Sequence, residues 1–124
     1  MKQKRILHIE DNPSNRKAVR HILRGTGYEL IEAANGEEGI DRALKDAPDL
    51  ILLDIQLPKI SGYDVARRLR VEPQTREVPI IAVTSYALSG DEETAAHVGC
   101  NDYISKPYRP NVLLEHVEKF LRAK

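Results

Sequence analysis

LILLD, residues 50–54, is the most uniformly apolar run of the chain, and it ends on the carboxylate of Asp54. A strand that is apolar on both faces is typical of the centre of a parallel sheet, where helices cover both sides. We therefore expect a strand over residues 49–55 in the middle of a sheet. Asp54 would then lie at the carboxyl end of that strand, on the edge where open α/β sheets bind their ligands.

Strand-like apolar runs and helix-like segments alternate five times along the 124 residues. Parallel strands need crossover connections, usually helices, so this alternation is typical of an α/β domain. The expected strands cover residues 4–10, 29–33, 49–55, 79–84 and 102–106. The expected helices cover residues 14–26, a segment containing 40–47, then 63–71, 89–98 and 109–122. No linker or repeat divides the chain, so we expect one domain over residues 1–124.

Four of the expected strands end on side chains that can take part in chemistry. In chain order these are Glu10 with Asp11, then Asp54, Thr84 and Lys106. Because the carboxyl ends of parallel strands lie along one edge, we expect these groups to converge on one small pocket. Close carboxylates repel one another, and one would take up a proton unless a cation lay between them. Hard oxygen ligands beside a phosphate site favour Mg²⁺.

A carboxylate in such a pocket can act as a nucleophile and form an aspartyl phosphate. Asp54 is the best candidate because it leaves the most central strand. Lys106 would offer positive charge to phosphate oxygens, and Thr84 a hydrogen bond. The alternative for each residue alone is structural: acidic residues end strands in solvated loops, threonine favours strands, and lysine is common on surfaces.

With these residues in place, the chain from Lys4 to the end of the last expected helix resembles the receiver domain of two-component response regulators. The resemblance rests on Glu10-Asp11-Asn12, on Asp54-Ile55-Gln56-Leu57-Pro58 with Gly62, on Thr84-Ser85, and on Tyr103-Ile104-Ser105-Lys106-Pro107. The first two stretches are also similar to single-domain regulators of cell-cycle type and to receivers of hybrid kinases. The implied fold is a doubly wound five-stranded parallel sheet of order 2-1-3-4-5, a flavodoxin-like three-layer sandwich.

The resemblance implies a role for each acidic residue. Asp54 would be the phospho-acceptor, and Asp11 and Asp54 would bind Mg²⁺ directly, together with the main-chain carbonyl of Gln56. Glu10 would act mainly through a metal-bound water. The Gln56 and Tyr86 positions vary across the family and are expected to influence how long the phosphoryl group lasts.

The same resemblance implies a switch on the other side of the pocket. Lys106 would pair with Asp54 at rest and with the phosphoryl oxygens after transfer. The peptide bond before Pro107 would be cis, a geometry that belongs to proline. Thr84 and Tyr103 would form the switch pair: the hydroxyl moves to the phosphate, and the ring turns into the space that it vacates.

The implied partners are proteins. A sensor histidine kinase or a histidine phosphotransfer protein would supply the phosphoryl group from its phosphohistidine. A downstream effector would bind the surface formed by residues 89–98, 102–106 and 109–122. Such a chain assists its own phosphorylation and dephosphorylation and is otherwise not an enzyme.

Composition limits the other classes of partner. Lys and Arg total 19, as do Asp and Glu, so the net charge is zero. This balance gives neither the basic footprint of a nucleic-acid binder nor a reason to adhere to an anionic membrane. No apolar run approaches the roughly 20 residues that span a bilayer. The lone Cys100 cannot form an internal disulfide, so we expect a cytoplasmic protein.

Two other functions remain to be tested. A haloacid-dehalogenase-like phosphatase would also form an acylphosphate, but those enzymes need a second aspartate two residues after the nucleophile, where this chain has Gln56. A non-phosphorylated binding module on the same fold is the other, and the intact set of site residues argues against it.

Overall fold

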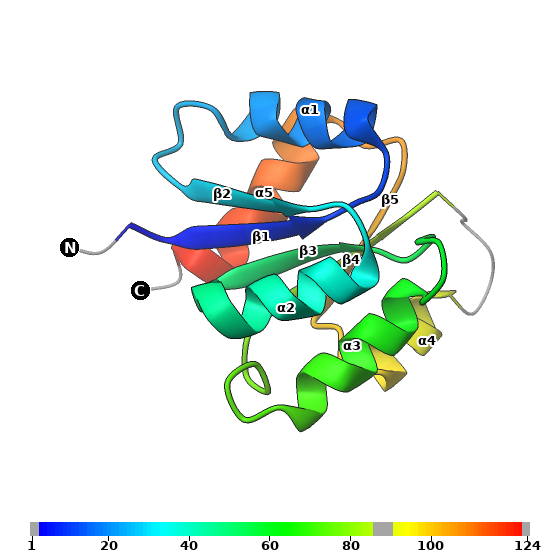
Figure 1. Ribbon diagram of the computed structural model, residues 1–124. Coiled ribbons are helices and arrows are strands. Elements are labelled where there is room, and N and C mark those ends of the chain that lie inside the picture. The colour runs from blue at the N-terminus through cyan, green and yellow to red at the C-terminus, as the bar shows by residue number, and fades with distance from the viewer. Residues whose placement is uncertain (1–2, 86–90, 123–124) are drawn as a thin grey trace.

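The computed structural model describes residues 3–85 and 91–122, and in these ranges five strands alternate with five helices. The strands are β1 (Arg5–Ile9), β2 (Glu29–Ala33), β3 (Leu50–Asp54), β4 (Ile80–Thr84) and β5 (Asp102–Ser105). The helices are α1 (Pro13–Leu23), α2 (Gly36–Asp46), α3 (Gly62–Val71), α4 (Asp91–His97) and α5 (Pro110–Leu121). All strand pairs are parallel, and the sheet order β2-β1-β3-β4-β5 confirms the predicted fold (Figure 1).

Strand β3 lies at the centre of the sheet and is buried along its whole length. Its side chains alternate between two cores, as the period of a strand requires. Leu50 and Leu52 belong to the core beneath α1 and α5, while Ile51 and Leu53 belong to the core beneath α2, α3 and α4 (Figure 1). Full burial of each such side chain contributes about 2 kcal/mol. The two cores therefore fix the register of β3 and the position of Asp54 at its end.

The helix that follows β1 begins where the sequence predicts and ends earlier. The Asn12 side chain caps α1 by accepting hydrogen bonds from the N–H groups of Ser14 and Asn15. The helix was expected to continue to residue 26 but ends at Leu23. The Thr26 hydroxyl donates to the Leu23 carbonyl at 2.6 Å, and Gly25 has a φ of +84°, so the chain leaves the helix there.

The fourth helix is shorter than the expected 89–98, and residues 89 and 90 lie outside the described part of the chain. The side chains of His8 and Cys100 are both buried. Burial lowers the pKa of His8 to about 4 and raises that of the Cys100 thiol to about 11. None of the described helices is long and apolar enough to cross a bilayer.

Candidate functional site

The carboxyl edge of the sheet brings together the acidic residues that the sequence predicts. Glu10 follows β1, and Asp54 ends the neighbouring β3. One carboxylate oxygen from each of Glu10, Asp11 and Asp54 lies within 4.8 Å of the others, and in the described residues this is the cluster that could hold a metal ion. Glu10 and Asp54 are almost fully buried, whereas Asp11 is exposed. The cluster therefore has a buried floor and an open mouth.

Lys106 enters the cluster from the end of β5. Its ammonium is 3.0 Å from Glu10 Oε1 and 3.9 Å from Asp54 Oδ1. The resemblance implies a pairing with Asp54, but the ammonium lies nearer to Glu10, which is buried to a similar extent. The Lys106–Pro107 peptide bond is cis, as expected.

The two buried carboxylates differ in how their charge is compensated. Burial alone would raise the pKa of Glu10, but the Lys106 ammonium and the Asn12 N–H bring it below its ordinary value. Burial and the nearby Glu10 carboxylate raise the pKa of Asp54 to about 6, despite Lys106. Of the two, Asp54 therefore carries the negative charge that the fold neutralises less completely, and a cation would relieve it.

The donor set suits magnesium. Three carboxylates supply hard oxygen ligands, and the open side at Asp11 leaves room for water and phosphate, both of which Mg²⁺ retains in protein sites. The backbone next to Asp54 is tightly packed: a Cβ on Gly62 would lie 2.4 Å from the Asp54 carbonyl oxygen. Only glycine fits there, so Gly62 lets the chain return to the backbone beside Asp54, where its N–H donates to the Ile55 carbonyl at 3.0 Å.

The hydroxyl side of the pocket contains a contact that sequence reasoning missed. Thr84 ends β4 and is fully buried, and Tyr103 is half-buried on the neighbouring β5. Sequence reasoning gave Gln56 a main-chain role at the metal and an influence on the lifetime of the phosphoryl group, but no side-chain partner. Its side-chain amide donates to the Thr84 hydroxyl and accepts from both the N–H and the hydroxyl of Ser85. No local signal could reveal this contact, because the partners are 28 and 29 residues away. Tyr86 lies outside the described residues.

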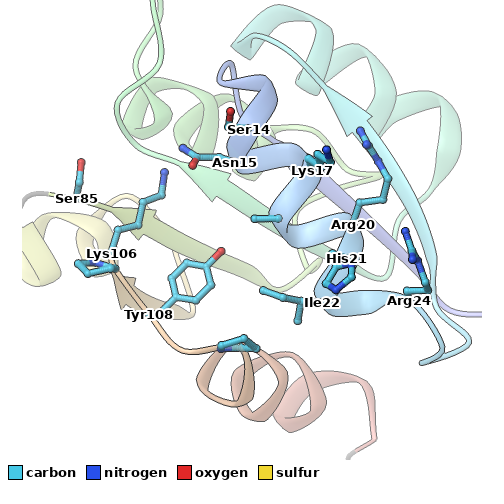
Figure 2. A pocket seen from close by; sticks show the side chains of 13 residues that line it. Ser14, Asn15, Lys17, Arg20, His21, Ile22, Arg24, Ser85, Lys106 and Tyr108 are labelled. Carbon is cyan, nitrogen blue, oxygen red and sulfur yellow. The ribbon is translucent and has the colours of Figure 1, made fainter.

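A groove of about 960 Å³ opens beside the acidic pocket, between α1 and the segment that joins β5 to α5. Figure 2 shows Lys106 and Ser85 at one end of the groove and the α1 side chains along the opposite wall. Ala18, Ile22, Pro107, Tyr108 and Pro110 supply its apolar lining. Lys17 and Arg24 supply positive charge, whereas the Arg20 guanidinium is paired with Glu32.

Comparisons with known proteins agree with this geometry. The response regulator receiver domain family matches residues 6–118. The polar-differentiation response regulator DivK of Brucella anthropi is 42% identical over 118 residues, which cover 95% of this chain and 96% of the relative.

Solved structures agree as well. The receiver domain of a sensor histidine kinase from Pseudomonas aeruginosa, with magnesium coordinated in its active-site cleft, is 35% identical with a TM-score of 0.90, covering 98% of this chain and 100% of that one. The chemotaxis response regulator CheY4 of Vibrio cholerae has a TM-score of 0.90 at 28% identity, covering 96% of this chain and 99% of that one. The chain therefore belongs to the response regulator receiver domain family, the phosphoacceptor signalling domains of two-component systems.

Proposed function

We propose that Asp54 is the phospho-acceptor of this receiver, and that Glu10, Asp11, Asp54 and the main-chain carbonyl of Gln56 hold Mg²⁺ beside it. The observation that carries the proposal is the incomplete neutralisation of Asp54, whose pKa is raised to about 6 in a cluster of three carboxylates. With that pKa, the carboxyl group is mostly ionised near neutral pH. It is therefore available as a nucleophile and still benefits from an added cation.

The transfer is a displacement at phosphorus. An Asp54 carboxylate oxygen attacks the phosphorus atom of a phosphohistidine, the P–N bond breaks, and the imidazole nitrogen keeps the electron pair. Mg²⁺ supplies positive charge to the phosphoryl oxygens when it is bound. The Lys106 ammonium, 3.9 Å from Asp54 Oδ1, supplies charge from the other side. Positioning and charge neutralisation thus account for the chemistry, and we propose no separate substrate for the chain to turn over.

The phosphohistidine donor is a histidine kinase or a histidine phosphotransfer protein, and we assign the groove beside α1 as its docking site. The groove is lined by Lys106, which also reaches Asp54, so a helix seated there brings a histidine to the acceptor. Its apolar floor and the cations of α1 fit a helix with an apolar stripe flanked by acidic residues. Ile22→Glu should slow transfer from the protein donor about tenfold more than transfer from a small phosphodonor.

Phosphorylation then shifts the population between two packings of β4, α4 and β5. Thr84 and Tyr103 are the proposed switch pair, and the α4–β5–α5 surface is what a downstream effector binds. Helix α4 supports this assignment because it has only seven residues and few apolar positions. A cytoplasmic location, with the buried thiol of Cys100 kept reduced, completes the proposal.

The experiment that tests the proposal is phosphorylation by phosphoramidate, whose P–N bond resembles that of phosphohistidine, in the presence of Mg²⁺. Mass spectrometry should map one acid-labile phosphate to Asp54, and EDTA should prevent its formation. Phosphate on another residue would refute the assignment. Turnover of a phosphate monoester would favour the haloacid-dehalogenase-like alternative, and failure to bind Mg²⁺ would favour a binding module that is not phosphorylated.

A further inference from the structure

The side chain of Gln56 joins two loops that meet above the phospho-acceptor. Gln56 lies two residues after Asp54, and its own N–H donates to Asp54 Oδ1 at 3.2 Å. From there the side chain reaches the end of β4. It contacts the Thr84 hydroxyl, the Ser85 N–H at 3.1 Å and the Ser85 hydroxyl at 3.0 Å. We call these three hydrogen bonds the Gln56 bridge.

The orientation of the amide follows from its partners. A backbone N–H can only donate, so the group that faces Ser85 N must be the Gln56 carbonyl oxygen. The amide nitrogen then faces Thr84, whose hydroxyl oxygen accepts from it. The Thr84 main chain is held separately, because its carbonyl accepts from the Lys106 N–H at 2.7 Å. The bridge therefore holds the Thr84 side chain at its hydroxyl oxygen, while the strand pairing holds its backbone.

We propose that the Gln56 bridge holds Thr84 and Ser85 in the resting arrangement and sets the free-energy difference between the resting and activated forms. This inference rests on the proposed function, in which the Thr84 hydroxyl moves to the phosphoryl group on Asp54. That movement breaks or rearranges hydrogen bonds that the resting form makes with one half-buried amide. Gln56 is thus a positioning residue, and it acts through Thr84 and Ser85.

The test is the affinity of the Mg²⁺-loaded protein for beryllofluoride, a phosphoryl mimic, measured by calorimetry. Gln56→Met leaves the main-chain carbonyl in place and keeps the side chain at a similar length, but it removes the bridge. A net hydrogen bond changes an equilibrium by a factor of about 2 to 12, so we expect the variant to bind beryllofluoride about three- to tenfold more tightly. Ser85→Ala removes one donor only, and its affinity should rise by about twofold. The beryllofluoride affinity of the double variant should rise by less than the product of the two single-variant factors, because both substitutions remove the same contact between Gln56 and Ser85.

Gln74→Met is the matched control, because Gln74 is exposed in the segment between α3 and β4. It should bind beryllofluoride as the parent chain does. A merely structural role for Gln56 would lower the free energy of unfolding and leave the beryllofluoride affinity unchanged. Unchanged or weaker binding by Gln56→Met would overturn the inference. If the parent chain itself failed to bind beryllofluoride, or if Asp54→Asn still bound it, the proposed function would fail instead.

Discussion

The two edges of the sheet both carry aspartates at strand ends, but in opposite electrostatic conditions. At the amino edge, Asp102 accepts hydrogen bonds from Lys119 and from the ring of His116. Burial alone would raise the pKa of Asp102, but these partners bring it below its ordinary value. At the carboxyl edge, burial and Glu10 raise the pKa of Asp54 to about 6. The charge of Asp102 is compensated by groups of the fold, whereas the charge of Asp54 is compensated only in part.

The carboxylates at the two edges of the sheet differ in how many partners the fold provides for them. At the amino edge, the Asp49 carboxylate accepts a hydrogen bond from the Arg5 N–H at 2.8 Å, so it too has a partner within the fold. At the carboxyl edge, among residues 3–85 and 91–122, a single ammonium, that of Lys106, lies within 4 Å of both Glu10 and Asp54. The resulting excess of negative charge destabilises the metal-free protein and would attract a cation, which in the proposed function supplies positive charge to the phosphoryl group.

The largest expected effect is on phosphoryl recognition. Asp54→Asn should abolish the response to beryllofluoride and Mg²⁺, because the acceptor oxygen loses its charge, whereas Asp102→Asn should keep the response. Nuclear magnetic resonance of backbone amides measures both, and the parent chain should show shifts near Asp54, Thr84 and Tyr103. A response that survived in Asp54→Asn would remove the distinction between the two edges.

Asp54 and Asp102 should contribute to the pH dependence of stability with opposite signs. Without metal, the folded protein holds its Asp54 proton up to about pH 6, while the unfolded chain loses it near 3.8, so the free energy of unfolding falls as the pH rises between these values. Asp54→Asn should remove this fall and be more stable than the parent chain at neutral pH by about 2 kcal/mol.

Asp102 has a lowered pKa, so its contribution is present above its unfolded value and disappears as the pH falls through its folded value. Asp102→Asn should therefore be less stable at neutral pH, by about 1 kcal/mol. Urea unfolding in EDTA from about pH 2 to 7 measures both variants, because the contribution of Asp102 is lost only below its unfolded pKa. The same sign for both would refute the electrostatic contrast.

Magnesium should stabilise the protein through the carboxyl edge alone. At about ten times its dissociation constant, Mg²⁺ should raise the free energy of unfolding by about 1.4 kcal/mol. Asp11→Asn should lose most of this increase, because it removes an exposed ligand without disturbing the core. Asp102→Asn should retain it. Thermal unfolding with and without Mg²⁺ is the measurement, and an equal loss in both variants would contradict the site.

The smallest expected effect lies at the amino edge, beside Arg5 and Asp49, where Ala47 ends α2 in the left-handed conformation with φ of 49°. Glycine adopts this conformation without strain, so Ala47→Gly should raise the free energy of unfolding by about 0.5 kcal/mol. Beryllofluoride titration of the same variant should match the parent chain, since the opposite edge is untouched. A changed affinity would mean that the two edges are coupled.

Much of the fold was predictable because its signals are local. The apolar run that ends on Asp54 predicts the central strand, and Asn12 followed by Pro13 predicts the start of α1. The end of α1 was predicted three residues too late. The Thr26 hydroxyl donates a hydrogen bond to the Leu23 carbonyl where the helix ends, and the apolar periodicity carries no information about such a bond. The acidic cluster followed from the rule that parallel strands end at one edge.

The sequence by itself determined which elements form and which carboxylates meet at the edge of the sheet, because these depend on apolar period and on strand direction. The order of the strands was implied by the resemblance to receiver domains. The tertiary structure alone decided that Lys106 lies nearer to Glu10 than to Asp54, and that the Gln56 amide reaches Thr84 and Ser85. These contacts join residues 96, 28 and 29 positions apart, and they depend on side-chain rotamers and burial. Chain folding must bring such groups together before their charges and hydrogen bonds can select a partner.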